Sequence, residues 1–203
     1  RLTAAVTPTV YERVMSSGTL HCGYFVFPPL SHKDPQTGAM SGIAVEMIET
    51  MAHNAGLKVE WAEEVTFADA ITGLIYDRYD AVCTPLWPIA ARAREAEFVT
   101  PSYFAVLGVW VRPDDLRFDG HLERLNDAAV RIAGVDGQIE QEIQRQYFPK
   151  AQMVSLTAGS DYGQSLLNVA TGKADVTFVD STAGTLYNKS HPDRPLRNVA
   201  RDR

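Results

Sequence analysis

The residue types that most often carry chemistry in proteins, histidine and cysteine, are few in this sequence and lie far apart. The histidines are His21, His32, His53, His121 and His191. No two of them have the spacing of a metal site, and the two cysteines form neither a Cys-x-x-Cys motif nor a His/Cys cluster. The sequence therefore predicts no metal ion and no cofactor.

Other signatures of catalysis are also missing. Ser31-His32 does not lie in a Gly-x-Ser-x-Gly elbow, so we do not expect a nucleophilic serine. Gly134-x-x-Gly137 is too short for a dinucleotide loop, and no Gly-Lys-Ser/Thr follows a predicted strand. We therefore predict no catalytic residues.

The two cysteines, Cys22 and Cys83, lie in apolar runs that resemble strands. Two buried thiols are the interpretation that we prefer. The alternative is one disulfide formed in an oxidising compartment.

Composition points to a folded protein that does not bind nucleic acid. The 203 residues are 45% hydrophobic with a net charge of -6, and no basic arm or patch stands out. No apolar run is long enough to span a bilayer, so we expect no membrane insertion. The sequence begins at Arg1 without an initiator methionine, and we expect that a targeting segment has been removed.

Hydrophobic periodicity predicts alternating strands and helices in two consecutive α/β sets. The predicted strands cover 20–25, 57–61, 81–84, 107–112, 131–134, 152–156 and 176–179. The predicted helices cover 9–17, 43–55, 67–76, 138–147 and 161–171, with another beginning near Ser181. A turn-rich loop is expected over 28–42, and Ile43, Met47, Ile48 and Met51 are expected to share the apolar face of the second helix.

Several short motifs follow one another along this pattern. They are Gly18-Thr19-Leu20 with Gly23, Phe27-Pro28-Pro29-Leu30, Thr37-Gly38 with Gly42, Gly73-Leu74 with Tyr79-Asp80-Ala81, Arg92 with Phe98, Thr100-Pro101 and Tyr103, Gly134 with Gly137 and Glu140, and Gly172-Lys173-Ala174-Asp175-Val176 with Asp180. In this order they resemble the polar amino-acid type of the bacterial extracellular solute-binding proteins, family 3. The resemblance runs from about Gly18 to about Gly184.

The resemblance implies an α/β fold of the periplasmic binding protein-like type II. Two α/β lobes, residues 1–106 and 107–203, would be joined by two crossing segments, with the ligand in the cleft between them. In this family the chain returns to the first lobe, and the sequence stops near Arg203, about where that return is expected. We therefore expect exposed apolar surface on the first lobe.

The resemblance also implies a function outside the cytoplasm. The expected protein is a periplasmic binding protein, not an enzyme, that captures an amino acid or related zwitterion. Its partner would be the membrane permease of an ABC importer.

Two charged residues are the expected anchors of such a ligand. The resemblance assigns the ligand carboxylate to Arg92, whose planar fork suits it, and the ammonium group to Asp180. A zwitterion bridging the lobes would favour closure. The alternatives are a surface arginine paired with Glu95 or Glu97, with Arg94 as a rival ligand, and a helix N-cap at Asp180.

Further ligand contacts are expected from both lobes. The resemblance places Phe27 over the ligand, and Gly137-Gln138 begin a helix whose free N–H groups suit a carboxylate. The alternative for Phe27 is a ring that only anchors its loop, and the alternative for Gly137-Gln138 is an ordinary strand-to-helix turn. Thr84 keeps a hydroxyl, whereas Trp87 brings bulk where many members have small hydroxyl residues, which favours an apolar or aromatic ligand side chain or a quaternary ammonium.

Two other functions stay open on the same fold. One is the ligand-sensing domain of a membrane receptor. The other is a cyclohexadienyl dehydratase-like enzyme, which needs a general acid near the ligand ring, with Glu140 and His32 as candidates. For the binding protein we predict that Arg92→Ala abolishes carboxylate binding and leaves the fold intact.

Overall fold

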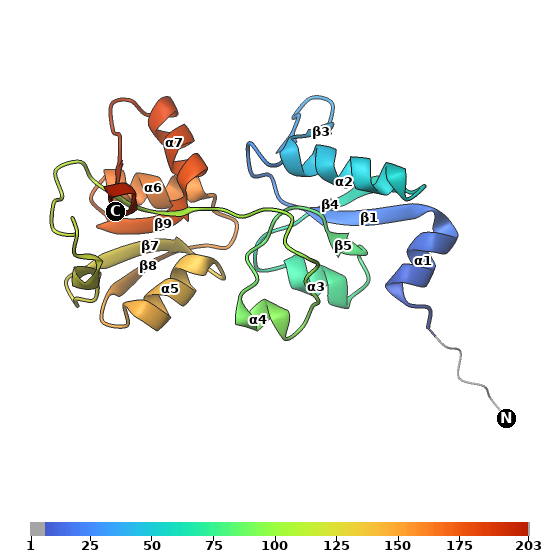
Figure 1. The fold of residues 1–203 in the computed structure, drawn as a ribbon, viewed down its shortest axis with the longest axis horizontal. Coiled ribbons are helices and arrows are strands. Elements are labelled where there is room, and N and C mark those ends of the chain that lie inside the picture. Colours follow the sequence, from blue (N-terminus) through green and yellow to red (C-terminus); the bar gives the residue numbers. More distant parts are fainter. Residues whose placement is uncertain (1–6, 203) are drawn as a thin grey trace. The chain divides into compact units, whose positions relative to one another are not determined.

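The chain forms two compact units in the computed structural model, which describes residues 7–202 (Figure 1). Unit 1 comprises the described chain up to Leu86 together with Arg94–Glu97, and unit 2 comprises Trp87–Ala93 and the chain from Phe98 onward. The lobe boundary expected at residue 106 stays a prediction. The first six residues, on which the expectation of a removed targeting segment depends, lie outside the described part.

Unit 1 is built on a three-stranded parallel sheet. Its elements are α1 (Val10–Ser17), β1 (Thr19–Tyr24), β2 (His32–Lys33), β3 (Met40–Ser41), α2 (Ile43–Asn54), β4 (Lys58–Glu64), α3 (Ala70–Ile75) and β5 (Ala81–Val82). The strand order is β4-β1-β5, and Figure 1 shows α2 and α3 on opposite sides of this sheet. β1 therefore occupies the centre, where its apolar residues are buried between the helices.

Local sequence signals explain the ends of α1. The Thr9 hydroxyl accepts a hydrogen bond from the Glu12 amide, and the Glu12 carboxylate accepts one from the Thr9 amide. Gly18 ends the helix in the left-handed conformation, at φ 69°. The predicted helix 9–17 is confirmed to within one residue.

Two expectations about the segment that follows β1 are wrong. Residues 28–42 are not wholly loop, because β2 and β3 form a short antiparallel hairpin. On α2 the buried residues are Ala44, Val45 and Ala52, whereas Ile43 and Met51 are more than half exposed. The two alanines allow this helix to approach the sheet closely, and the larger side chains lie outside the contact.

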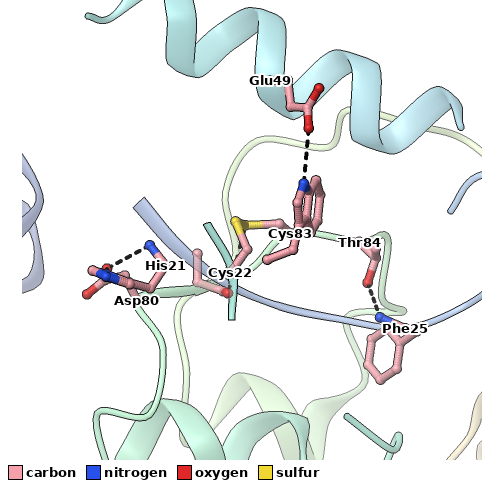
Figure 2. Close-up of a disulfide and its surroundings, with 9 residues drawn as sticks. His21, Cys22, Phe25, Glu49, Asp80, Cys83 and Thr84 are labelled. Carbon is pink, nitrogen blue, oxygen red and sulfur yellow. Dashed lines mark hydrogen bonds and ion pairs between the residues drawn. A yellow bond between two sulfur atoms is a disulfide. The ribbon is translucent and has the colours of Figure 1, made fainter. Parts of the chain in front are cut away.

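Cys22 and Cys83 form a disulfide, so the preferred interpretation of two buried thiols is wrong. Cys22 lies on β1, and Cys83 follows β5, the neighbouring strand. Both residues are buried, and their Cα atoms are 5.4 Å apart. Figure 2 shows the disulfide between the His21–Asp80 pair and the hydrogen bond that joins Phe25 to Thr84.

A buried tyrosine explains two of the motif glycines. Tyr79 is 2% exposed, and its hydroxyl donates to the carbonyl oxygen of Ala70 at 2.6 Å. A Cβ atom at Gly23 would lie 2.7 Å from the tyrosine ring, and one at Gly73 would overlap it. β1 and α3 can enclose this ring because both positions lack a side chain.

Unit 2 is built on a five-stranded mixed sheet. Its elements are α4 (Ala90–Ala93), β6 (Leu107–Val111), η1 (Leu122–Leu125), β7 (Arg131–Val135), α5 (Ile139–Tyr147), β8 (Gln152–Leu156), α6 (Tyr162–Ala170), β9 (Val176–Asp180), α7 (Ser181–Ser190), β10 (Arg197–Asn198) and η2 (Val199–Asp202). The order is β10-β6-β9-β7-β8, in which β7 is parallel to β8 and β9 while β6 is antiparallel to β9. Figure 1 shows α6 and α7 on one side of the sheet and α5 on the other.

An ion network fixes one end of this sheet. Asp175, just before β9, accepts hydrogen bonds from the Arg131 side chain at 3.1 Å and from Arg117 at 3.0 Å. Burial alone would raise the pKa of Asp175, but these hydrogen bonds outweigh it and lower the pKa. Asp175 therefore has a structural role.

Candidate ligand-binding site

Arg92 lies on the short helix α4 and is buried, with 5% of its surface exposed. Its Nη1 donates to the carbonyl oxygen of Trp87 at 3.1 Å, and its Nη2 donates to that of Gly137 at 2.7 Å. Burial lowers the pKa of Arg92, while Tyr162 and Glu140 act in the opposite direction. The alternative of a surface arginine is therefore wrong.

The turn between β7 and α5 is the second part of the site. Gly137 has φ 79°, a left-handed conformation that favours glycine. Its amide donates to the Gln141 side chain at 3.0 Å, and the Gln138 amide donates to the carbonyl of Val135 at 3.1 Å. These two amides are thus engaged within unit 2, and Gly137 instead offers its carbonyl to Arg92.

The side chain of Gln138 turns into unit 2 and is 1% exposed. Its Oε1 accepts a hydrogen bond from the Tyr162 hydroxyl at 3.1 Å, whereas its Nε2 has no hydrogen-bond partner among the described residues. Burial raises the pKa of Tyr162, and so does the nearby carboxyl of Glu140. The structure therefore joins Trp87, Arg92 and Gly137 by hydrogen bonds near the start of α5, and Gln138 is the next residue along the chain.

Asp180 lies at the junction of β9 and α7, where it is the N-cap of the helix. Its Oδ1 accepts from the amides of Thr182 at 2.7 Å and Ala183 at 3.3 Å, and its Oδ2 accepts from the Tyr103 hydroxyl at 3.4 Å. The capping alternative is thus present in the structure. A ligand role for Asp180 stays a prediction and would fall to Oδ2, whose hydrogen bond from Tyr103 is long.

Phe27 and Thr84 belong to unit 1. The Phe27 amide donates to the carbonyl of Ser31 at 2.8 Å, and the half-buried ring extends from this tight loop. The buried Thr84 hydroxyl accepts from the Phe25 amide at 3.0 Å and so holds the end of β1. Both contacts are structural, and the ligand roles of Phe27, Thr84 and the Trp87 indole stay predictions.

Sequence reasoning overlooked Tyr162 and did not foresee how deeply Glu140 is buried. Glu140 is 0% exposed, although it lies in a helix of mostly polar residues. The available signal was Gly134 on β7, because a Cβ atom there would lie 2.7 Å from the Glu140 Cβ. A glycine in a strand under a helix often marks a place where another part of the chain approaches closely. The other candidate acid, His32, is exposed.

The part of the chain that the structure describes contains neither a candidate metal site nor a candidate membrane span. No group of three or more histidine, cysteine, aspartate or glutamate side chains in residues 7–202 could hold a metal ion. No helix in that part of the chain has the length and apolar character needed to cross a bilayer.

Several known proteins are similar to this chain in sequence. The chain is 28% identical to the probable ABC transporter extracellular-binding protein YckB of Bacillus subtilis over 182 residues, which is 89% of the chain and 59% of YckB. It is 28% identical to a probable amino-acid ABC transporter-binding protein of Haemophilus influenzae, over 96% of the chain and 72% of that protein. The chain thus spans less than two thirds of the length of YckB.

A solved structure extends the comparison to the fold. The ancestral amino acid-binding protein AncCDT-1, described as a precursor of cyclohexadienyl dehydratase, superimposes with a TM-score of 0.78 at 24% identity, covering 90% of this chain and 79% of that one. The predicted α/β fold of the periplasmic binding protein-like type II is confirmed by this likeness. The sequence profile of the bacterial extracellular solute-binding proteins, family 3, matches residues 22–150, and the chain belongs to that family.

Proposed function

We propose that this protein captures a small solute with a carboxylate, an amino acid or related zwitterion, and delivers it to the permease of an ABC importer. The observation that carries the proposal is the buried Arg92, oriented by the carbonyls of Trp87 and Gly137. A guanidinium held in a fixed orientation is suited to bidentate recognition of a carboxylate. The family and both transporter relatives support solute binding, and the Haemophilus influenzae relative, named a probable amino-acid ABC transporter-binding protein, supports this class of ligand.

The disulfide supports a location outside the cytoplasm. Disulfides persist in the periplasm and outside the cell, where reducing systems do not remove them. The Cys22–Cys83 disulfide is buried in unit 1, as a structural rather than a reactive disulfide would be. We therefore propose a periplasmic or extracellular protein.

A ligand screen tests the proposal. The melting temperature of the purified protein is measured with each standard amino acid, glycine betaine, several dicarboxylic acids and prephenate. A ligand that binds only the folded state raises the melting temperature. We expect at least one α-amino acid to do so, and the size of its side chain would show what Trp87 accepts. No stabilisation by any amino acid contradicts the proposal.

A dehydratase is the second candidate, and Glu140 is the observation that favours it. Burial raises the pKa of this carboxyl to about 8, so it keeps a proton at neutral pH, as a general acid must. However, the Glu140 side chain is fully buried against Gly134, which argues against proton delivery to a ligand. We therefore favour binding without chemistry. Turnover of prephenate by the wild-type protein would reverse this order.

A further inference from the structure

Glu140 is a buried acid for which the proposed binding function has no role. It is 0% exposed, and neither of its carboxyl oxygens has a hydrogen-bond partner among residues 7–202. Burying a polar group without a hydrogen bond costs stability, so such groups are rare in folded proteins. The bare Gly134 beneath it leaves room for the Glu140 stem and fixes its place against the sheet.

The groups that face Glu140 come from three directions. From α4 comes the positive charge of Arg92, and from α6 comes the Tyr162 hydroxyl, both of which interact with it electrostatically. From the sheet come Gly134 and the methyl group of Met153, which are apolar. Arg92 is thus the cation that Glu140 meets when it loses its proton.

The same short turn connects Glu140 to the arginine. Gly137, three residues earlier, accepts the Nη2 hydrogen bond of Arg92, and the Gln138 Oε1 accepts a hydrogen bond from the Tyr162 hydroxyl. Burial favours the neutral form of Glu140 and raises its pKa to about 8, against smaller opposing effects of its own amide and of Arg92. The Glu140 carboxyl is therefore neutral at pH 7 and becomes charged as the pH rises through about 8.

We propose that Glu140 is a positioning residue whose proton controls how strongly Arg92 holds the carboxylate of the ligand. The inference rests on the proposed function. With Glu140 neutral, the charge of Arg92 acts on the ligand. With Glu140 ionised, two carboxylates compete for one guanidinium, and ligand binding weakens. By linkage, the bound ligand must in turn favour the protonated form of Glu140.

The pH profile of affinity tests the inference. Binding of L-glutamine, L-arginine and L-phenylalanine is measured by titration calorimetry between about pH 6 and 9 for the wild type, Glu140→Gln and the control Glu142→Gln. Glu142 lies on the same helix, and its carboxylate pairs with Arg145 at the surface. The α-ammonium group of each probe titrates equally in all three proteins, so its contribution cancels.

Between about pH 7 and 9 we expect the ligand affinity of the wild type and of Glu142→Gln to fall. The factor by which it falls should be at least about threefold larger than the corresponding factor for Glu140→Gln. Parallel profiles for the wild type and Glu140→Gln contradict the inference and leave the proposed function standing. If neither these probes nor any amino acid of the melting-temperature screen binds the wild type, the proposed function fails and the inference fails with it.

A second measurement examines the coupling without any ligand. The carboxyl carbon of Glu140 is followed by NMR through a pH titration of the wild type and of Arg92→Gln. Removing the neighbouring positive charge is expected to raise the pKa of Glu140 further. An ordinary pKa near that of exposed glutamates, or a pKa unchanged by Arg92→Gln, contradicts the inference.

Discussion

Arg92 and Asp180 each make structural hydrogen bonds beside the ligand role that is predicted for them. The family spacing identified Arg92, and the structure adds the two carbonyls that orient it. For Asp180 the capping alternative is present alongside the proposed role, because an aspartate after a strand and before a helix satisfies the first amides. Sequence could not separate these uses, since each needs the same side chain at the same place.

The motif glycines can be tested through Tyr79. We expect Gly73→Ala to lower the free energy of unfolding by about 2 kcal/mol, because its methyl group overlaps the buried Tyr79 ring. Urea titration of the two variants Gly73→Ala and Gly159→Ala provides the measurement. Gly159 has open space around it and no left-handed φ, so its variant should unfold like the wild type. Equal midpoints for both variants would contradict this role of Gly73.

At the scale of elements, strand and helix order was predictable because hydrophobic periodicity and the capping residues lie within each segment. The face of α2 was not, since the residues it buries against the sheet are two alanines and a valine rather than the larger apolar side chains. The β2–β3 hairpin was missed for another reason: its strands are two residues long and carry no alternating pattern. The burial of Glu140 was not predictable either, because it depends on Gly134, the strand residue against which this helix residue packs.

The disulfide connects β1 to the end of β5, and its effect belongs to unit 1. Closing a loop of 61 residues in the unfolded chain is expected to contribute about 4 kcal/mol. The Cys22→Ala/Cys83→Ala protein should therefore unfold at a lower urea concentration than the oxidised wild type. Wild type treated with a reductant serves as the control and should behave like the variant. Coincident unfolding of the oxidised and reduced proteins would contradict this contribution.

The Asp175 network joins the beginnings of β7 and β9. Asp175→Asn leaves Arg131 and Arg117 without their shared carboxylate and is expected to cost about 3 kcal/mol at neutral pH. Because folding lowers the pKa of Asp175, its contribution is present above the unfolded pKa, near 3.8, and is lost as the pH falls further. The difference in unfolding free energy between wild type and variant should thus shrink in acid. A difference independent of pH would show that lost packing, not charge, is responsible.

For the whole molecule, Glu140 has the opposite effect on the pH dependence of stability. Its pKa is about 8 when folded and near 4.5 when unfolded, so the folded protein binds an extra proton between these values. The contribution of Glu140 to the free energy of unfolding is therefore highest below its unfolded pKa and falls as the pH rises to about 8. Glu140→Gln should remove this slope and be the more stable protein at pH 8. Parallel stability curves from chemical denaturation at several pH values would contradict the burial of a proton at this site.

The fold class and the family were predictable from the sequence, because several short motifs in order specify them even though each is weak alone. The hydrogen bonds that orient Arg92 were not predictable, since they depend on groups that meet only in the folded chain. Tyr162, which follows the Asp161 cap at the start of α6, carries no sequence signal for its hydrogen bond to Gln138. The side chain of the ligand was not predictable either, because Trp87 is compatible with several kinds of side chain.

The central claim is that Arg92 holds the ligand carboxylate, and a double-mutant cycle between protein and ligand tests it most directly. The affinity of the amino acid found by the screen and of its α-amide is measured by calorimetry with the wild type and with Arg92→Gln. Arg94→Gln, at the exposed neighbouring arginine, is the control. We expect the amide to bind the wild type at least about tenfold more weakly than the acid, and to bind Arg92→Gln about as well as the acid does. If the acid keeps its advantage over the amide in Arg92→Gln, the carboxylate is bound elsewhere and the claim is wrong.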